Sequence, residues 1–192
     1  MLNEVLVFLK DHLNHHLRPG AALASDETQE EAVVFVDGEK MDPINFKLGA
    51  VSVLLINVEE DNSLRPSDPY LGMSPSGDTI RINPEIPMNL YVLFVARYKQ
   101  YESGLAQLSD IIRHFQTHRV FDRQNSPELG TDIEKLILEL VTLPLSEQNE
   151  LWNALRTTYH PSVLYKVRMV VFRDSDAKRP VEVSEKVVRT SQ

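Results

Sequence analysis

Histidine pairs four residues apart are the first feature of this sequence that could do chemistry. His12 and His16 stand at that spacing near the N-terminus, and His114 and His118 repeat it further along the chain. Residues four apart share one face of a helix, so two imidazoles at this spacing can bind one metal ion. Neither pair has the glutamate of an H-E-x-x-H motif or an identifiable third ligand. We therefore interpret His12 and His16 as a solvated helix end and predict no metal site.

A run of three carboxylates, Glu59, Glu60 and Asp61, follows an apolar stretch. Neighbouring carboxylates can act as general acid and base, or they can bind magnesium. Charged residues also mark the point where a buried strand enters solvent, and this is the interpretation we favour. A hydrolase that uses these carboxylates is the enzymatic alternative.

Other catalytic and nucleotide-binding signatures are missing from the sequence. The segment GMSPSG at 72–77 resembles a nucleophile elbow, but G-x-S-x-G requires glycine where Ser76 stands. Neither G-x-x-x-x-G-K-[ST] nor G-x-G-x-x-G occurs, which argues against a nucleotide site. Because the chain has no cysteine, thiolate nucleophiles, zinc–thiolate sites and disulfides are excluded. We predict no catalytic residues and no cofactor.

The charge balance bears on the partners of the protein. The 28 acidic and 20 basic residues give a formal net charge of −8, which repels phosphate backbones and anionic lipid. No apolar run approaches the ~20 residues that span a bilayer, and the opening segment lacks a basic region and a cleavage site. We predict cytoplasmic synthesis and assembly, with neither nucleic acid nor membrane as a partner.

The hydrophobic pattern predicts the elements that position these residues. Ala50 to Val58 and Asn89 to Arg97 are apolar at both alternate sets of positions, which is typical of strands covered on both faces. Leucines three or four apart predict a helix over 2–17. A further amphipathic helix is expected to place five residues on the sheet, namely Tyr101, Leu105, Leu108, Ile112 and Phe115. Trp152 is expected in the core under a third helix.

Strands and helices alternate through the second half of the chain, and its 192 residues need only one core. We predict an α/β fold: a single domain with a mixed β-sheet and helices packed on it. Its domain would occupy residues 1–173, and a charged extension or edge strand would occupy 174–192. The region from Glu59 to Met88 is rich in proline and small polar residues, so we expect a long loop that forms a contact surface.

Four segments, taken in order, resemble a known family. They are VLVFLKDHLN, INVEEDNSLRP, NLYVLFVARYKQYESGLAQLSDIIRHFQTHRVF and LILELVTLPLSEQNELWNALRTTYHPSVLYKVRMVVF. Together they resemble the tail-terminator, or cap, proteins of phage-tail-like contractile injection systems, from about Val5 to Phe172. The most specific part is LSEQNELWNAL followed by YHPSVLYKVRM.

The resemblance implies a tail-terminator-type fold, assembly into a hexameric ring, and no reaction. The ring would bind the inner tube protein and the sheath protein at the end distal to the baseplate, stop polymerisation and lock sheath to tube. The particle that contains it can be released from the cell. A baseplate or neck adaptor of the same machine is the alternative.

Ring closure and docking need exposed contact patches, which we place in the two segments outside the expected core. An available sheet edge around Val181 and Val183 could accept a strand from a sheath subunit. The predicted interface residues are Glu59, Glu60, Leu64, Arg65, Tyr70, Arg81, Val181 and Val183.

Overall fold

The protein is described by a computed structural model over residues 2–17, 31–38, 44–61, 71–73, 79–81, 87–130 and 133–171. The helices within these ranges are α1 (Leu2–His16), α2 (Tyr101–Thr117) and α3 (Leu145–Ala154). The strands are β1 (Val33–Phe35), β2 (Ala50–Glu60), β3 (Leu71–Met73), β4 (Thr79–Arg81), β5 (Met88–Arg97), β6 (Val120–Asp122), β7 (Ile133–Val141) and β8 (Ser162–Val171). No helix in these ranges is long and apolar enough to cross a membrane.

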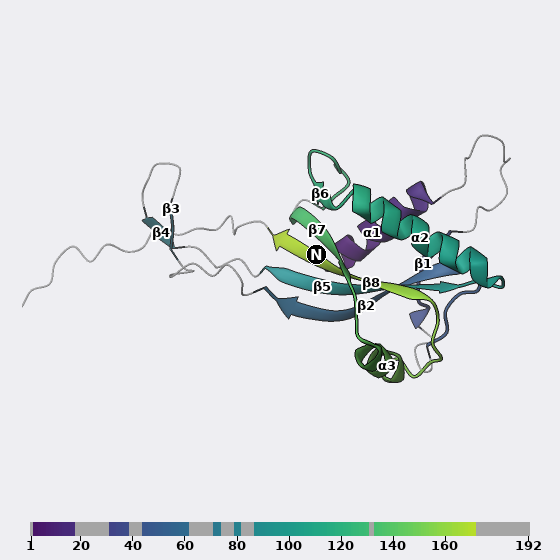
Figure 1. Ribbon diagram of the computed structural model, residues 1–192. Helices are drawn as coiled ribbons and strands as arrows, with labels where there is room; N and C mark the ends of the chain where they lie inside the picture. Colours follow the sequence, from purple (N-terminus) through teal and green to yellow (C-terminus); the bar gives the residue numbers. More distant parts are fainter. Residues whose placement is uncertain are drawn as a thin grey trace, which may run out of the picture.

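Six strands form one sheet in the order β1-β2-β5-β8-β7-β6. The edge strand β1 runs parallel to β2, and the other neighbours are antiparallel, so the sheet is mixed as predicted. Helices α1 and α2 cover one face of the sheet, and α3 lies on the other face (Figure 1). The predicted α/β architecture, a mixed sheet with helices packed on it, is confirmed.

Strand β5 is the central element that the sequence predicted. Leu90, Val92 and Phe94 point into the cluster beneath α1 and α2. Leu93 and Val95 point into the smaller cluster beneath α3. All five side chains are buried, because the pleat sends alternate residues to faces that are both covered.

Helix α2 packs on the sheet by a face that overlaps the predicted one only in part: Leu108 and Phe115 are buried as expected, and Tyr101 and Leu105 are not. Tyr101 and Leu105 are 65% and 41% exposed, whereas Gly104, Leu108 and Ile111 are buried together with His114 and Phe115. A Cβ built on Gly104 would lie 3.5 Å from Ala96 and from Tyr98. These are ordinary van der Waals distances, so Gly104 lies on the side of α2 that packs on the sheet, while Tyr101 and Leu105 face solvent.

Helix α1 is joined to the edge strand β1 by a buried asparagine. Asn14 Nδ2 donates to Val33 O over 2.7 Å, and Val33 N donates to Asn14 Oδ1 over 2.9 Å. The Asn14 amide therefore pairs both backbone groups of Val33, as a further strand would. This contact fixes α1 against the start of the sheet.

The smaller core on the second face is built around Trp152, as predicted. Trp152 is 5% exposed and packs with Phe46, Leu54 and Leu164. Its ring meets Phe46 edge to face at 6.1 Å between centroids. The prediction that Trp152 is a core residue is confirmed.

The region from Glu59 to Met88 is only partly the loop that we predicted. Strand β2 continues to Glu60, and β3 pairs with β4 in a separate two-stranded sheet. Short paired strands escaped the sequence analysis because three-residue strands carry too little periodicity to detect.

Candidate functional site

The predicted carboxylate run lies at the exposed end of β2. Glu59 and Glu60 are exposed, and Tyr91 Oη donates to Glu59 Oε2 over 3.0 Å. Burial and this hydrogen bond raise the pKa of Tyr91. Asp61 Oδ2 forms an ion pair of 3.1 Å with Arg168 on β8. The carboxylates thus end a buried strand at its entry into solvent, in keeping with the interpretation that we favoured.

The other predicted interface residues can be placed only in part. Arg81 ends β4, where it pairs with Leu71 across the hairpin. Leu64, Arg65, Tyr70, Val181 and Val183 lie outside the described residues. All eight positions therefore remain predictions as contact residues. The edge strands of the six-stranded sheet are β1 and β6.

A groove of about 350 Å³ lies at the opposite end of the sheet from Glu59 and Glu60. Leu48, Tyr101 and Tyr159 are 55%, 65% and 60% exposed, and with Tyr98 they line what we call the tyrosine groove. Burial raises the pKa of Tyr98, whose ring packs towards Gly104. The sequence analysis missed this groove because it assigned Tyr101 to the core. The sequence signal that could have indicated the groove is the presence of Tyr98, Tyr101 and Tyr159 next to helix ends.

Four histidines meet between α1 and α2. His12 Nε2 lies 2.9 Å from His114 Nε2, and the rings of His16 and His118 lie 3.9 and 4.6 Å from the His114 ring. Since an imidazole nitrogen either donates or accepts, the two Nε2 atoms share a single proton when both rings are neutral. We call these four residues the histidine cluster.

The histidine cluster corrects the interpretation of His12 as part of a solvated helix end, whereas His16 is exposed as that interpretation predicts. Burial, followed by the neighbouring imidazoles of His16, His12 and His118, lowers the pKa of His114 to about 3. Burial also lowers the pKa of His12. Both predicted pairs have the four-residue spacing, but only the packing of α1 against α2 brings the two pairs together.

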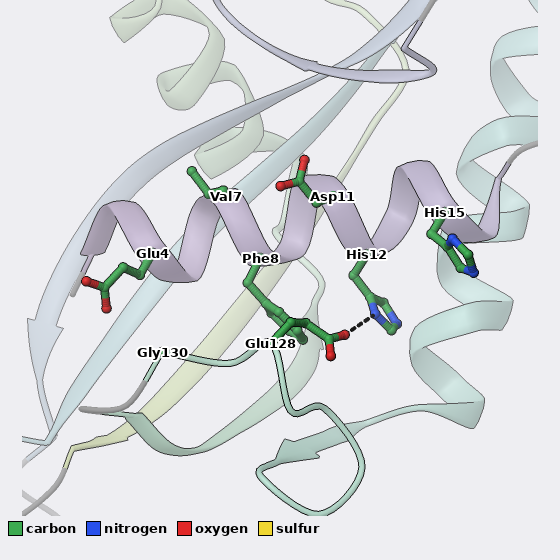
Figure 2. A pocket seen from close by; sticks show the side chains of 8 residues that line it. All are labelled: Glu4, Val7, Phe8, Asp11, His12, His15, Glu128 and Gly130. Carbon is green, nitrogen blue, oxygen red and sulfur yellow. Dashed lines mark ion pairs between the residues drawn. The ribbon is translucent and has the colours of Figure 1, made fainter. Parts of the chain in front are cut away.

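A hollow of about 500 Å³ lies beside the histidine cluster, along α1 (Figure 2). Phe8 forms part of its wall, and Glu4, Asp11 and Glu128 give it an acidic rim. His12 Nδ1 lies 3.9 Å from Glu128 Oε1, as the dashed line in Figure 2 shows. Glu4 points towards Gly130, where an added Cβ would meet its carboxylate oxygen at 2.7 Å. A larger residue at position 130 would therefore move the flexible Glu4 side chain aside.

The histidine cluster does not have the geometry of a metal site. In the described part of the chain, no group of three or more His, Asp or Glu side chains is arranged to hold a metal ion. The 2.9 Å contact between His12 Nε2 and His114 Nε2 has the length of a hydrogen bond between the two imidazoles, and two nitrogens are fewer than the three or four protein ligands of a zinc site. The cluster therefore acts as packing between two helices, and the absence of a cofactor stays a prediction.

The whole chain was compared with known proteins. A family model described as the Pvc16 N-terminal domain matches residues 4–185. None of the curated proteins matches the chain. Among solved structures, it is similar to the PVC sheath/tube terminator of an extracellular contractile injection system in the extended state, with a TM-score of 0.59 at 15% identity. It is also similar to the anti-feeding prophage cap, a tube-terminating cap, with a TM-score of 0.49 at 17% identity.

The alignments cover more of this chain than of the two larger proteins. The terminator alignment covers 100% of this chain and 64% of the terminator, and the cap alignment covers 72% of this chain and 49% of the cap. The chain thus spans less than two thirds of the length of either relative. Similarity to the terminator over the whole chain confirms the predicted tail-terminator type of fold.

Proposed function

We propose that this chain, which belongs to the Pvc16 N-terminal domain family, caps the end of the inner tube and sheath of a contractile injection system. The observation that carries the proposal is the fold that it shares, over its whole length, with a protein described as a sheath/tube terminator. Binding of the last tube ring and the last sheath ring would stop polymerisation and lock sheath to tube.

The proposal includes assembly into a hexameric ring with no reaction and no cofactor. A closed ring requires a heterologous interface, in which two different patches of each subunit meet. A subunit with a two-sided core and distinct exposed ends suits this role, because the core keeps the patches at a fixed separation. Assembly would take place in the cytoplasm, before the completed particle is released.

Electron microscopy of particles made without the protein tests the proposal. We expect tubes or sheaths of uncontrolled length or unstable distal ends, since nothing then stops the addition of subunits. Particles of normal length and stability would contradict the cap function. Labelling the protein in complete particles distinguishes the alternative of a baseplate or neck adaptor, because an adaptor labels at a different position.

The hydrolase alternative is tested by the double variant Glu59→Gln, Glu60→Gln. The amide side chains keep the size of the carboxylates and remove their charge and basicity. A cap needs no carboxylate chemistry, and the amide oxygens can still accept hydrogen bonds across a subunit contact, so this variant should still end the particles at the native length. Replacing residues 64–70 with glycine and serine should instead give a folded subunit that fails to dock, and unchanged docking would show that the contact lies elsewhere.

A further inference from the structure

Within the described residues, the two ends of the sheet expose side chains of different charge. The pairing of β2 with β5 starts at Ala50 opposite Arg97 and finishes at Glu60 opposite Met88, so these pairs mark the two ends. At the Glu60 end, which we call the acidic end, Glu59 and Glu60 are exposed. Glu134 is a further exposed acid at this end, because its neighbour Ile133 begins β7 there.

Two basic residues of the described chain lie near the acidic end. Arg168 is paired with Asp61, and Lys135 is partly buried in β7. The acidic end also exposes an apolar side chain, because Val58 is 39% exposed beside Glu59. It therefore presents carboxylates next to an aliphatic group.

The opposite end, which we call the basic end, holds the tyrosine groove. Lys47 and Lys99 are exposed, and each is the chain neighbour of a residue that lines the groove, Leu48 before β2 and Tyr98 after β5. Arg97 Nη1 donates to Phe46 O over 2.6 Å, which holds the start of β2 against the end of β5. Exposed acids near this end are Glu102, at the start of α2, and Glu31, whose carboxylate forms an ion pair of 3.0 Å with Lys10.

We propose that the basic end, with its tyrosine groove, binds the acidic end of a second copy of this chain. Exposed lysines would meet Glu59 and Glu60, while the groove would cover the exposed Val58. Tyrosine suits such a contact because its ring packs against apolar groups and its hydroxyl stays hydrogen-bonded. Opposite charges steer two copies into one orientation, since two acidic ends or two basic ends repel each other.

The contact joins two different surfaces, so it is heterologous and repeats from copy to copy. Such a contact gives a ring when the rotation between copies closes. This inference rests on the proposed function, because it names the subunit–subunit surface of the cap ring. The alternative occupants of the groove, a tube or a sheath subunit, are outcomes of the test below.

Charge reversal at one end or at both ends tests the inference. Lys47→Glu with Lys99→Glu makes the basic end acidic, and Glu59→Lys with Glu60→Lys makes the acidic end basic. Each two-residue variant should weaken self-association of the full chain on the order of 100-fold, because like charges then face each other. The four-residue variant, whose net charge equals that of the native chain, should regain self-association. Sedimentation at several salt concentrations measures the dissociation constants.

Two controls separate the contact from general effects. Glu147→Lys with Glu150→Lys changes the net charge as much as the acidic-end variant, on exposed positions of α3, and should leave self-association unchanged. Leu48→Ser tests the groove without a change of charge and should also weaken self-association. Circular dichroism confirms that each variant is folded.

The outcomes separate this inference from the cap function. A native chain that stays monomeric at every concentration, or two-residue variants that associate like the native chain, overturn the inference. If such variants associate normally but no longer bind tube or sheath, the basic end or the acidic end binds those partners and the inference is wrong. If the charge-reversal variants change self-association as expected but particles made without the protein have normal ends, the cap function fails and the subunit contact stands.

Discussion

The two faces of the sheet differ in how much structure covers them. The face under α1 and α2 holds the larger cluster, which includes residues from both helices and from all six strands of the sheet. The face under α3 holds a smaller cluster around Trp152, and α3 buries only that one residue completely. Burial of apolar side chains contributes most of the stability of a fold. Because the first face buries more of them, we expect it to contribute most of the free energy of unfolding.

Polar contacts follow the same division. On the first face, Asn14 pairs both backbone groups of Val33, and His12 meets His114 in a part-buried contact. On the second face, the buried Nε1 of Trp152 has no hydrogen-bond partner within the described residues. On the first face His114 Nδ1 is likewise buried without a partner among the described residues, so the difference between the faces lies in the Asn14 contact that fixes α1 to β1.

Truncation of the shared central strand should have the largest effect. Phe94 is fully buried under α2, against Phe115 and Tyr165. Phe94→Ala should lower the free energy of unfolding by about 3–5 kcal/mol, because it removes apolar contacts and leaves a cavity. Denaturant titration measures the change. Leu105→Ala, on the exposed side of α2, is the matched control and should change stability by no more than about 0.5 kcal/mol.

Removal of the Asn14 amide should have the next largest effect. Asn14→Ala leaves both backbone groups of Val33 without partners at a buried position, which should cost about 2–4 kcal/mol. Hydrogen exchange at the Val33 amide should also become faster. Asn153→Ala, at an exposed position of α3, serves as control; equal effects of the two variants would contradict the assigned role of Asn14.

The histidine cluster predicts an acid-dependent loss of stability on the first face. His114 remains neutral in the folded chain down to about pH 3, whereas the unfolded chain binds a proton near the ordinary pKa of 6.5. The unfolded state therefore holds more protons between these values, and stability falls as the pH drops below 6.5. Between pH 7 and pH 5 the loss should be about 2 kcal/mol.

Thermal or denaturant unfolding at both pH values measures this loss. His114→Gln should reduce the difference between pH 7 and pH 5, because glutamine does not titrate. His15→Gln, at the exposed end of α1, is the control and should keep the native dependence. The same pH dependence in His114→Gln and in the native chain would contradict the role of the cluster.

Replacement of Trp152 by phenylalanine should have the smallest effect. The variant removes an N–H without a partner in the described structure and keeps most of the apolar contact with Phe46. The expected loss is about 1 kcal/mol, and denaturant titration measures it. Trp152→Ala provides the contrast, because it empties the smaller core; a loss above about 3 kcal/mol in Trp152→Phe would show that the second face depends on the indole itself.

Sequence patterns were reliable where one element carried the information. The two-sided character of β5 and the burial of Trp152 followed from apolar residues along a single strand or helix. The face of α2 could not be chosen in this way, because its apolar residues occupy more than one side. In the structure Gly104, Ile111 and His114 face the sheet beside Leu108 and Phe115, and this orientation exposes Tyr101.

The candidate surfaces show the same limit. The exposure of Glu59 and Glu60 was predictable, because charges follow a buried strand directly in the chain. The tyrosine groove was not, since Leu48, Tyr101 and Tyr159 lie far apart in sequence and meet only when the strand ends are aligned.

The sequence by itself determined the α/β class, the central strand and the resemblance to tail terminators, because these depend on local periodicity and on the order of segments. Only the tertiary structure decided that the two histidine pairs form one cluster and that the sheet has a basic end and an acidic end. Both features depend on distances between residues that are remote in sequence, and the packing of helices on the sheet sets those distances.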